Sequence, residues 1–427
     1  MRLRLLLPLL LLVCLTTSCV PGTGFGTFGT RGPTPAWSLK GVAAGDQMAV
    51  VDGTLIFLTR KEIRGVDVIS GRDLWTIPFL PGLRYATRDN PWFSVARGAV
   101  ILVEAPGSYE RGIIRAIDPG TGRLLWSDGP ATSVEVSQDA VFVHSCADGL
   151  SECTTTRREP RTGRAAWSEV PNPFGWTGFD DQRTLARPTG RYFVTDTTRK
   201  SSMLRDTRNG RRTAMAAVPE WNSWRSVGPA VVFIGKLYDD ACQVELSSFD
   251  AEHARPRWKR TICFPLGTGD DYNPGFPHAP GGFIGDDTRI ATLTPEGIPQ
   301  ILDLTTGNIL WRSAESGTPL DSDGTSLLTR RAKDQGPLTM LDFPTGRALW
   351  TAPDPGLTAG DTRWRTFVNQ DFTAIAGLHE GEPSVAVYDT GTGRPTGRYS
   401  GIFKGAGDGW IAVETKRFGY DLDFFFL

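Results

Sequence analysis

One ten-residue phrase recurs along this chain of 427 residues. It reads IDPGTGRLLW at 117–126, LDLTTGNILW at 302–311 and LDFPTGRALW at 341–350. Weaker copies cover 66–75, 158–167, 204–214, 247–258 and 387–397. The turn positions of the eight copies run from residue 71 to residue 393, a spacing of about 46 residues. A repeat of this length constrains the fold strongly, because units of this kind bury a core only by stacking on their neighbours.

Each letter of the phrase has a structural role. An apolar run such as AVILVE comes before the phrase and predicts a strand. The Asp stands where that strand ends, and its carboxylate can accept hydrogen bonds from turn N–H groups. The Gly tolerates the positive φ that a type I turn followed by a bulge requires. The Trp then places aromatic surface at the same point of every unit.

The residues predicted to fill these positions are Asp67, Gly71, Trp75, Asp118, Gly122, Trp126, Gly163, Trp167, Trp258, Asp303, Gly307, Trp311, Asp342, Gly346 and Trp350. A row of tryptophans can also form a platform for a carbohydrate or a cofactor. The fixed register of these tryptophans in the repeat favours packing between units instead.

The repeat predicts an all-β fold. About 46 residues with about four short strands make one blade of a β-propeller. Helical repeats are excluded because no segment keeps a 3.6-residue period for ten residues. A β-sandwich disagrees with the length and with the regular repeat. We predict four-stranded antiparallel blades arranged in a closed ring.

The number of blades is harder to derive. Near the N-terminus, PAWSLKG at 35–41 looks like the outgoing half of the phrase, and the C-terminus ends in an incoming half. Trp37 would then fill the repeat position of the last blade, and the N-terminal strand would pair with C-terminal strands to close the ring. Eight turns plus this composite blade would give nine blades. Because three copies are degenerate, one turn could be miscounted, and the prediction is an eight-bladed β-propeller over residues 36–427.

The N-terminus predicts export and lipid attachment. Arg2 and Arg4 precede an apolar run at 5–15, which is typical of a signal peptide and short for a membrane span. The following TTSC resembles a lipobox, so residues 1–18 are predicted to be removed and Cys19 to be lipidated. The alternative is a plain signal peptide with an incidental Cys. Residues 19–35 would form a Gly/Thr/Pro-rich tether that holds the propeller on the extracytoplasmic side of the membrane.

Four further cysteines fit an oxidising compartment. Cys146 and Cys153 lie on either side of one predicted turn, and Cys242 and Cys263 flank a second hairpin. Three pairings are possible, and we predict 146–153 and 242–263. Four free thiols are the alternative, and a metal site is less favoured because no CxxC or CxH spacing occurs.

The phrase resembles the repeat of quinoprotein-type (PQQ-like) propellers. That family has eight four-stranded blades. It includes pyrroloquinoline-quinone alcohol dehydrogenases and non-enzymatic lipoproteins such as the propeller subunit of the outer-membrane β-barrel assembly machine. The lipidated start and the truncated last repeat resemble the lipoprotein branch. The dehydrogenases carry adjacent cysteines and calcium ligands that cannot be matched here, so no cofactor or metal residue is carried over from the resemblance, and an enzyme is not the expected function.

Charge and motifs narrow the function further. The formal net charge is −1, which gives no reason to expect a nucleic-acid partner. DSDG at 321–324 suggests a calcium loop, but the acid required at position 332 is Ala332, so a plain turn is favoured. The irregular segment Gly267–Gly285 is the candidate contact loop. Its candidate contact residues are Asp270, Asp271, Tyr272 and Phe276.

Two functions remain open at this point. The first is a monomeric, lipid-anchored propeller that binds protein partners of the cell envelope as a scaffold or assembly factor. It would lie on the outer face of the cell membrane in a Gram-positive host and face the periplasm otherwise. The alternative is binding or catalysis on a small molecule, a quinone or a sugar, in the central funnel of the ring.

Overall fold

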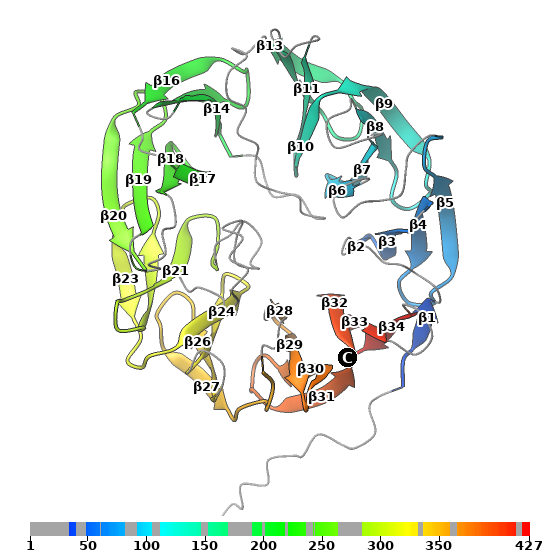
Figure 1. The fold of residues 1–427 in the computed structure, drawn as a ribbon, viewed down its shortest axis with the longest axis vertical. Coiled ribbons are helices and arrows are strands. Elements are labelled where there is room, and N and C mark those ends of the chain that lie inside the picture. Colours follow the sequence, from blue (N-terminus) through cyan, green and yellow to red (C-terminus); the bar gives the residue numbers. More distant parts are fainter. Residues whose placement is uncertain are drawn as a thin grey trace, which may run out of the picture.

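The structure is a computed structural model. The described residues are 34–39, 48–59, 61–81, 92–104, 112–146, 153–169, 190–198, 201–217, 221–235, 242, 244–263, 284–331, 336–358, 365–415 and 421–427. They form antiparallel sheets arranged as blades around a ring (Figure 1).

The first three blades each have four strands. Blade 1 contains β2 (Met48–Val51), β3 (Thr54–Leu58), β4 (Glu62–Asp67) and β5 (Asp73–Pro78). Blade 2 contains β6 (Trp92–Ala96), β7 (Ala99–Glu104), β8 (Gly112–Ile117) and β9 (Leu124–Ala131). Blade 3 contains β10 (Ser133–Ser137), β11 (Ala140–Cys146), β12 (Cys153–Arg158) and β13 (Ala165–Glu169).

In the described part of the chain, blades 4 and 6 show three strands each, and blade 5 between them shows four. Blade 4 contains β14 (Tyr192–Thr198), β15 (Ser201–Asp206) and β16 (Arg212–Ala216). Blade 5 contains β17 (Trp221–Val227), β18 (Ala230–Gly235), β19 (Val244–Asp250) and β20 (Pro256–Ile262). Blade 6 contains β21 (Arg289–Leu293), β22 (Pro299–Asp303) and β23 (Ile309–Arg312).

The last three blades again have four strands. Blade 7 contains β24 (Thr318–Ser322), β25 (Ser326–Arg330), β26 (Leu338–Asp342) and β27 (Ala348–Ala352). Blade 8 contains β28 (Arg365–Val368), β29 (Phe372–His379), β30 (Glu382–Asp389) and β31 (Pro395–Ser400). Blade 9 contains β32 (Ile402–Gly407), β33 (Trp410–Thr415), β34 (Asp421–Phe426) and β1 (Trp37–Leu39).

The prediction of eight blades is wrong, because the described residues form nine sheets. Each of the eight repeat turns belongs to a sheet of its own, including the degenerate copies in blades 4, 5 and 8. The composite of the two chain ends adds the ninth sheet. A blade therefore survives the loss of its Trp or its Gly, because strand pairing through the backbone is enough to form the hairpin.

The ring closes where the sequence predicted. β1 pairs antiparallel with β34, with Trp37 opposite Phe424. Their rings are stacked with centroids 4.0 Å apart. The Trp37 indole Nε1 also donates to the Val68 carbonyl of blade 1 at 2.9 Å. The N-terminal strand is thus the outer strand of blade 9 and bonds to blade 1 at the same time.

The repeat turn has the geometry that its letters predict. In blade 2, the Gly122 N–H donates to the Asp118 carbonyl at 2.9 Å, and Gly122 has a φ of 69°. The Asp118 carboxylate accepts the Thr121 N–H at 3.1 Å and the Thr121 hydroxyl at 2.9 Å. The Thr121 hydroxyl is the largest cause of the lowered pKa of Asp118, since a hydrogen bond to the carboxylate favours the charged form.

The core lies between the blades, with each sheet facing a neighbour on either side. Ile56 and Leu58 of blade 1 pack with Phe93 of blade 2. Leu55 and Phe57, which alternate with them along β3, pack instead against blade 9. Strand alternation thus gives each blade two apolar faces, and neither is buried unless the ring is complete.

Candidate functional site

The repeat tryptophans hold neighbouring blades together. Trp75 lies on the turn of blade 2, where a Cβ on Gly122 would be 2.6 Å from the Trp75 Cγ. Its indole Nε1 donates to the Pro119 carbonyl at 2.7 Å. The structure places Trp37, Trp126, Trp167, Trp258, Trp311 and Trp350 on the turn glycines of the next blades in the same way. These rings fill contacts between blades, which is packing and not a ligand platform.

The hydrogen bond repeats with the packing. The indole donates to the carbonyl three residues before the turn glycine, at 2.6–2.9 Å, for Trp37, Trp75, Trp126, Trp167, Trp311 and Trp350. Trp258 contacts Gly307 without this bond, and its buried Nε1 has no partner among the described residues. The contact between blades 5 and 6 therefore lacks the indole hydrogen bond that the other Trp-on-Gly contacts make.

The contact between blades 4 and 5 is built differently. The position of the Trp in blade 4 is Ala214, and the turn of blade 5 has Ala254, with a φ of 51°, where the other turns have Gly. The Thr213 hydroxyl donates to the Ala251 carbonyl at 2.6 Å, as an indole does elsewhere. With no ring lying on the turn, a methyl group at Ala254 is tolerated.

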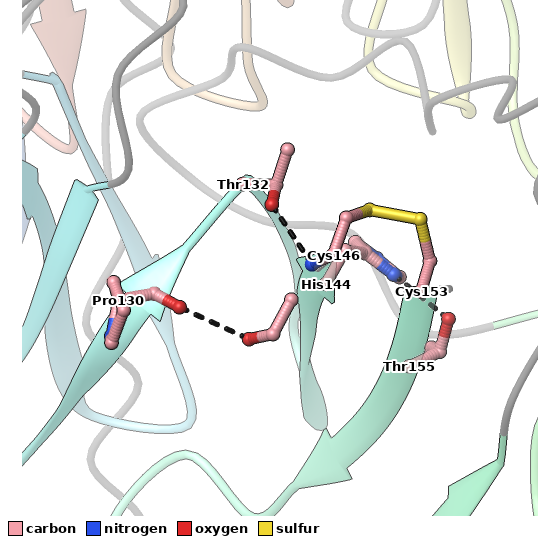
Figure 2. Close-up of a disulfide and its surroundings, with 7 residues drawn as sticks. Pro130, Thr132, His144, Cys146, Cys153 and Thr155 are labelled. Atoms are coloured by element: carbon pink, nitrogen blue, oxygen red, sulfur yellow. Dashed lines mark hydrogen bonds between the residues drawn. A yellow bond between two sulfur atoms is a disulfide. The ribbon is translucent and has the colours of Figure 1, made fainter. Parts of the chain in front are cut away.

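Both predicted disulfides are present. Cys146 and Cys153 face each other as directly paired residues of β11 and β12, and they close the loop between these strands (Figure 2). Cys242 is bonded to Cys263, so the start of the hairpin in blade 5 is joined to the residue that follows β20. Both bonds lie at the ends of the strands opposite the repeat turns.

His144 lies beside the first disulfide and is buried. Its Nδ1 is 2.9 Å from the Thr155 hydroxyl on β12 (Figure 2). Burial lowers the pKa of His144 to about 3, since the charged imidazolium would lose its hydration. The ring is therefore neutral at physiological pH and belongs to the packing of blade 3.

One inner strand carries a perturbed carboxyl group. Asp321 on β24 accepts the Ser322 N–H at 2.8 Å, and burial raises the pKa of Asp321 to about 7. The rest of the DSDG motif is a turn, because the Asp323 carboxylate accepts the N–H groups of Thr325 and Ser326 at 2.8 and 2.7 Å. Within the described ranges, no group of three or more His, Cys, Asp or Glu side chains could hold a metal ion.

Several predicted residues lie outside the described residues. They are the lipidation site Cys19 and the contact-loop residues Asp270, Asp271, Tyr272 and Phe276. The described end of that loop, Ile284 and Gly285, lies against β21, with Ala291 N donating to the Ile284 carbonyl at 2.7 Å. The loop thus returns to the edge of blade 6. No helix in the described part of the chain is long and apolar enough to cross a membrane.

The outer strand of blade 5 was missed by sequence reasoning. β20 and the residue directly before it carry four exposed cationic side chains at the rim: Arg255, Arg257, Lys259 and Arg260. The run RPRWKR at 255–260 is the signal in the sequence, but a disulfide-linked hairpin accounts for this segment without giving its charges a role. Its place on the rim becomes clear only when the blades are assembled.

These features define a class of protein. The chain is a PQQ-like β-propeller whose blades are joined by Trp-on-Gly contacts. The family model described as outer membrane protein assembly factor BamB matches residues 59–313, which is more than half of the chain. The chain therefore belongs to this family, which is mostly non-enzymatic. No curated protein matches the chain at a significant level.

Solved structures resemble the chain at low sequence identity. BamB from Moraxella catarrhalis is 14% identical over 78% of this chain and 96% of that chain, with a TM-score of 0.43. The quinohemoprotein alcohol dehydrogenase ADHIIG from Pseudomonas putida HK5 is 12% identical over 89% and 73%, with a TM-score of 0.39. A eukaryotic initiation factor is 10% identical over 86% and 90%, with a TM-score of 0.53, and this likeness concerns the fold alone.

Proposed function

We propose that this protein is a lipid-anchored propeller that binds protein partners at the bacterial cell envelope, as a scaffold or assembly factor. The observation that carries the proposal is membership of the family described as an outer membrane protein assembly factor. The rigid ring supports it, since indole-to-carbonyl bonds tie blade to blade around most of the circumference. A rigid ring offers wide surfaces whose backbone needs little ordering when a partner binds.

The anchor is the second part of the proposal. The TTSC sequence that ends at Cys19 supports lipidation, and the four remaining cysteines support an oxidising compartment. Cells that express the full chain are labelled with radioactive palmitate. Label on the wild type and none on Cys19→Ser is the expected result. Equal labelling of both would overturn the anchor.

Partner binding is tested in the same cells. The tagged chain is crosslinked in intact cells, solubilised gently and purified. We expect one stoichiometric protein to co-purify with it. The absence of any such protein, with the chain intact and folded, would reject the scaffold function.

A second candidate function rests on Asp321. A carboxyl group on an inner strand with a pKa raised to about 7 is the kind of group that small-molecule sites use. Binding of a quinone or a sugar in the central funnel is the corresponding hypothesis. Native mass spectrometry of the purified chain tests it, because a retained small-molecule mass that is lost in Asp321→Ala would support this function. A spectrum with the bare chain alone would reject it.

A further inference from the structure

The outer strands of the nine blades are equivalent by position but not by charge. β20 has three cationic residues, Arg257, Lys259 and Arg260, and Arg255 comes directly before it. The other outer strands, β1, β5, β9, β13, β16, β23, β27 and β31, have no more than one each. Protection of an edge strand against aggregation does not explain the difference, because all nine edges need it equally.

We propose that this basic strip, Arg255, Arg257, Lys259 and Arg260, is the docking surface for an acidic segment of a protein partner. The inference rests on the proposed function and names the chemistry of its partner. The strip lies on a chain with a formal net charge of −1, so the cationic excess is local and does not follow from the composition.

The carboxylates near the strip are already engaged. Glu245 pairs with Lys259 at 2.5 Å, and Glu252 pairs with Arg191 of blade 4 at 2.7 Å. Asp250 accepts the N–H groups of its own turn, at 2.9 and 3.0 Å. No ion pair to Arg255 or Arg257 occurs among the described residues, and both side chains are exposed. Their guanidinium groups are thus available to bind carboxylates, and Arg binds these through two parallel hydrogen bonds.

The strip is also held rigid. The residue after β20, Cys263, is bonded to Cys242, and its carbonyl accepts the Leu293 N–H of blade 6 at 2.9 Å. The Arg260 Nε donates to the Gly307 carbonyl at 2.7 Å, also in blade 6. A strand fixed at its end and along its side holds the backbone that carries these charges in place, so binding does not have to order that backbone.

The contact next to the strip, on the blade 4 side, lacks the indole of the repeat. Lys259 reaches Glu245, which lies on the same side of β19 as Phe249 and its cluster with Tyr192 of blade 4. Blade 4 has Ala214 at the position where most other blades have the repeat Trp, and Ala214 is only partly buried. The strip therefore borders the contact between blades 4 and 5. Among the described contacts from blade 1 to blade 7, this is the one with a small side chain, Ala214, in the Trp position.

The position on the ring favours a protein over a membrane surface. The chain begins its path around the ring at β1, in blade 9, and β20 lies across the ring from it (Figure 1). An anchor joined to β1 through the predicted tether would therefore attach on the side of the ring opposite the basic strip. That placement leaves the strip open to a protein partner.

The binding test uses the full chain purified in detergent and a fluorescein-labelled peptide of alternating glutamate and threonine. The strip variant is Arg257→Glu with Lys259→Glu. The matched control is Arg123→Glu with Arg347→Glu, two exposed arginines that follow the turn glycines of blades 2 and 7. Both variants change the net charge equally, and equal unfolding midpoints would show that both fold.

We expect the strip variant to lose affinity by about tenfold or more, and the control by less than about twofold. Affinity of the wild type should fall as salt is added, because exposed charges are screened. No binding of the peptide to the wild type, or equal loss in both variants, would overturn the proposal. So would strip-dependent binding to phosphatidylglycerol vesicles without strip-dependent binding of the peptide, since the surface would then serve the membrane.

The same variants separate this inference from the function on which it rests. In crosslinked cells, a partner that co-purifies with the wild type and the control but not with the strip variant supports both. A partner that co-purifies equally with all three rejects the basic strip and leaves the scaffold function standing. The absence of any partner of the wild type rejects both.

Discussion

The Trp-on-Gly contact leads to a quantitative prediction at Gly122. A Cβ at this position would lie 2.6 Å from the Trp75 Cγ, and the residue has a φ of 69°. The positive φ costs a non-glycine residue about 1 kcal/mol. Displacing a packed indole adds about 1–3 kcal/mol, as overpacking does in cores. We therefore expect Gly122→Ala to lower the free energy of unfolding by about 2–4 kcal/mol.

Gly53 provides the matched control. It has a φ of 76°, but a Cβ there would have no atom within 4 Å. Gly53→Ala should therefore cost only the backbone term of about 1 kcal/mol. Unfolding in guanidinium chloride, followed by tryptophan fluorescence, measures both variants. If the two variants lose equal stability, the contact with the indole contributes nothing and the reasoning about the repeat is refuted.

Three further predictions concern pH, covalent bonds and ring closure. The pKa of Asp321 is raised from 3.8 to about 7 in the folded protein, so its neutral form stabilises the fold at low pH and this contribution is lost as pH rises through about 7. Asp321→Asn should then raise the unfolding midpoint at pH about 8 and leave it unchanged at pH about 4; equal shifts at both would contradict this. Removing the bond between Cys242 and Cys263, which are 21 residues apart, should cost about 3 kcal/mol, and reductant should then lower the midpoint less than in the wild type, because only the bond between Cys146 and Cys153 is left to reduce. Trp37→Ala removes the stack on Phe424 and should cost about 2–4 kcal/mol, with faster proteolysis of the N-terminal strand as the measurement; unchanged proteolysis would show that β1 closes the ring without its Trp.

The sequence predicts the fold class because the repeat encodes local geometry. Asp118, Thr121 and Gly122 lie within one turn, and their bonds depend on neighbours in the chain. The disulfide pairing was predictable for the same reason, since Cys146 and Cys153 flank one hairpin. The closing strand could be predicted because half a phrase stands at each end of the chain.

The predicted number of blades was wrong, although the eight turns and the composite blade together count to nine. Blades 4, 5 and 8 have lost a Trp or a Gly, so a count based on matches to the repeat motif gives these copies little weight. Backbone pairing does not depend on those letters: Ala254 takes the turn conformation at a φ of 51°, and Asp250 N still donates to the Arg255 carbonyl at 2.8 Å. The sequence shows which side chains are present, while the ring size depends on how many hairpins the backbone can complete.

The candidate site was less predictable than the fold, because it depends on which residues share a rim. RPRWKR reads as part of a hairpin until β20 is placed as the outermost strand of blade 5. The raised pKa of Asp321 likewise depends on β24 lying at the inner edge of its blade, next to β28. Charge and burial at such positions come from the assembly of units far apart in the sequence.

Blade 4 shows how the family repeat can change without loss of the ring. The loss of its Trp removes the ring that would lie on the next turn, and two substitutions accompany the loss. Thr213 supplies the hydrogen bond to the Ala251 carbonyl, and Ala254 occupies the turn, which a Trp on that turn would forbid. Thr213 lies in blade 4 and Ala254 in blade 5, on the two sides of one contact between blades. The contact between blades 4 and 5, which lacks the Trp ring, borders the basic strip of β20. The missing Trp and the cluster of cations are two departures from the repeat at neighbouring positions on the rim. Packing alone gives no reason for cations to gather beside a contact that lacks its indole, and the proposed acidic partner supplies one.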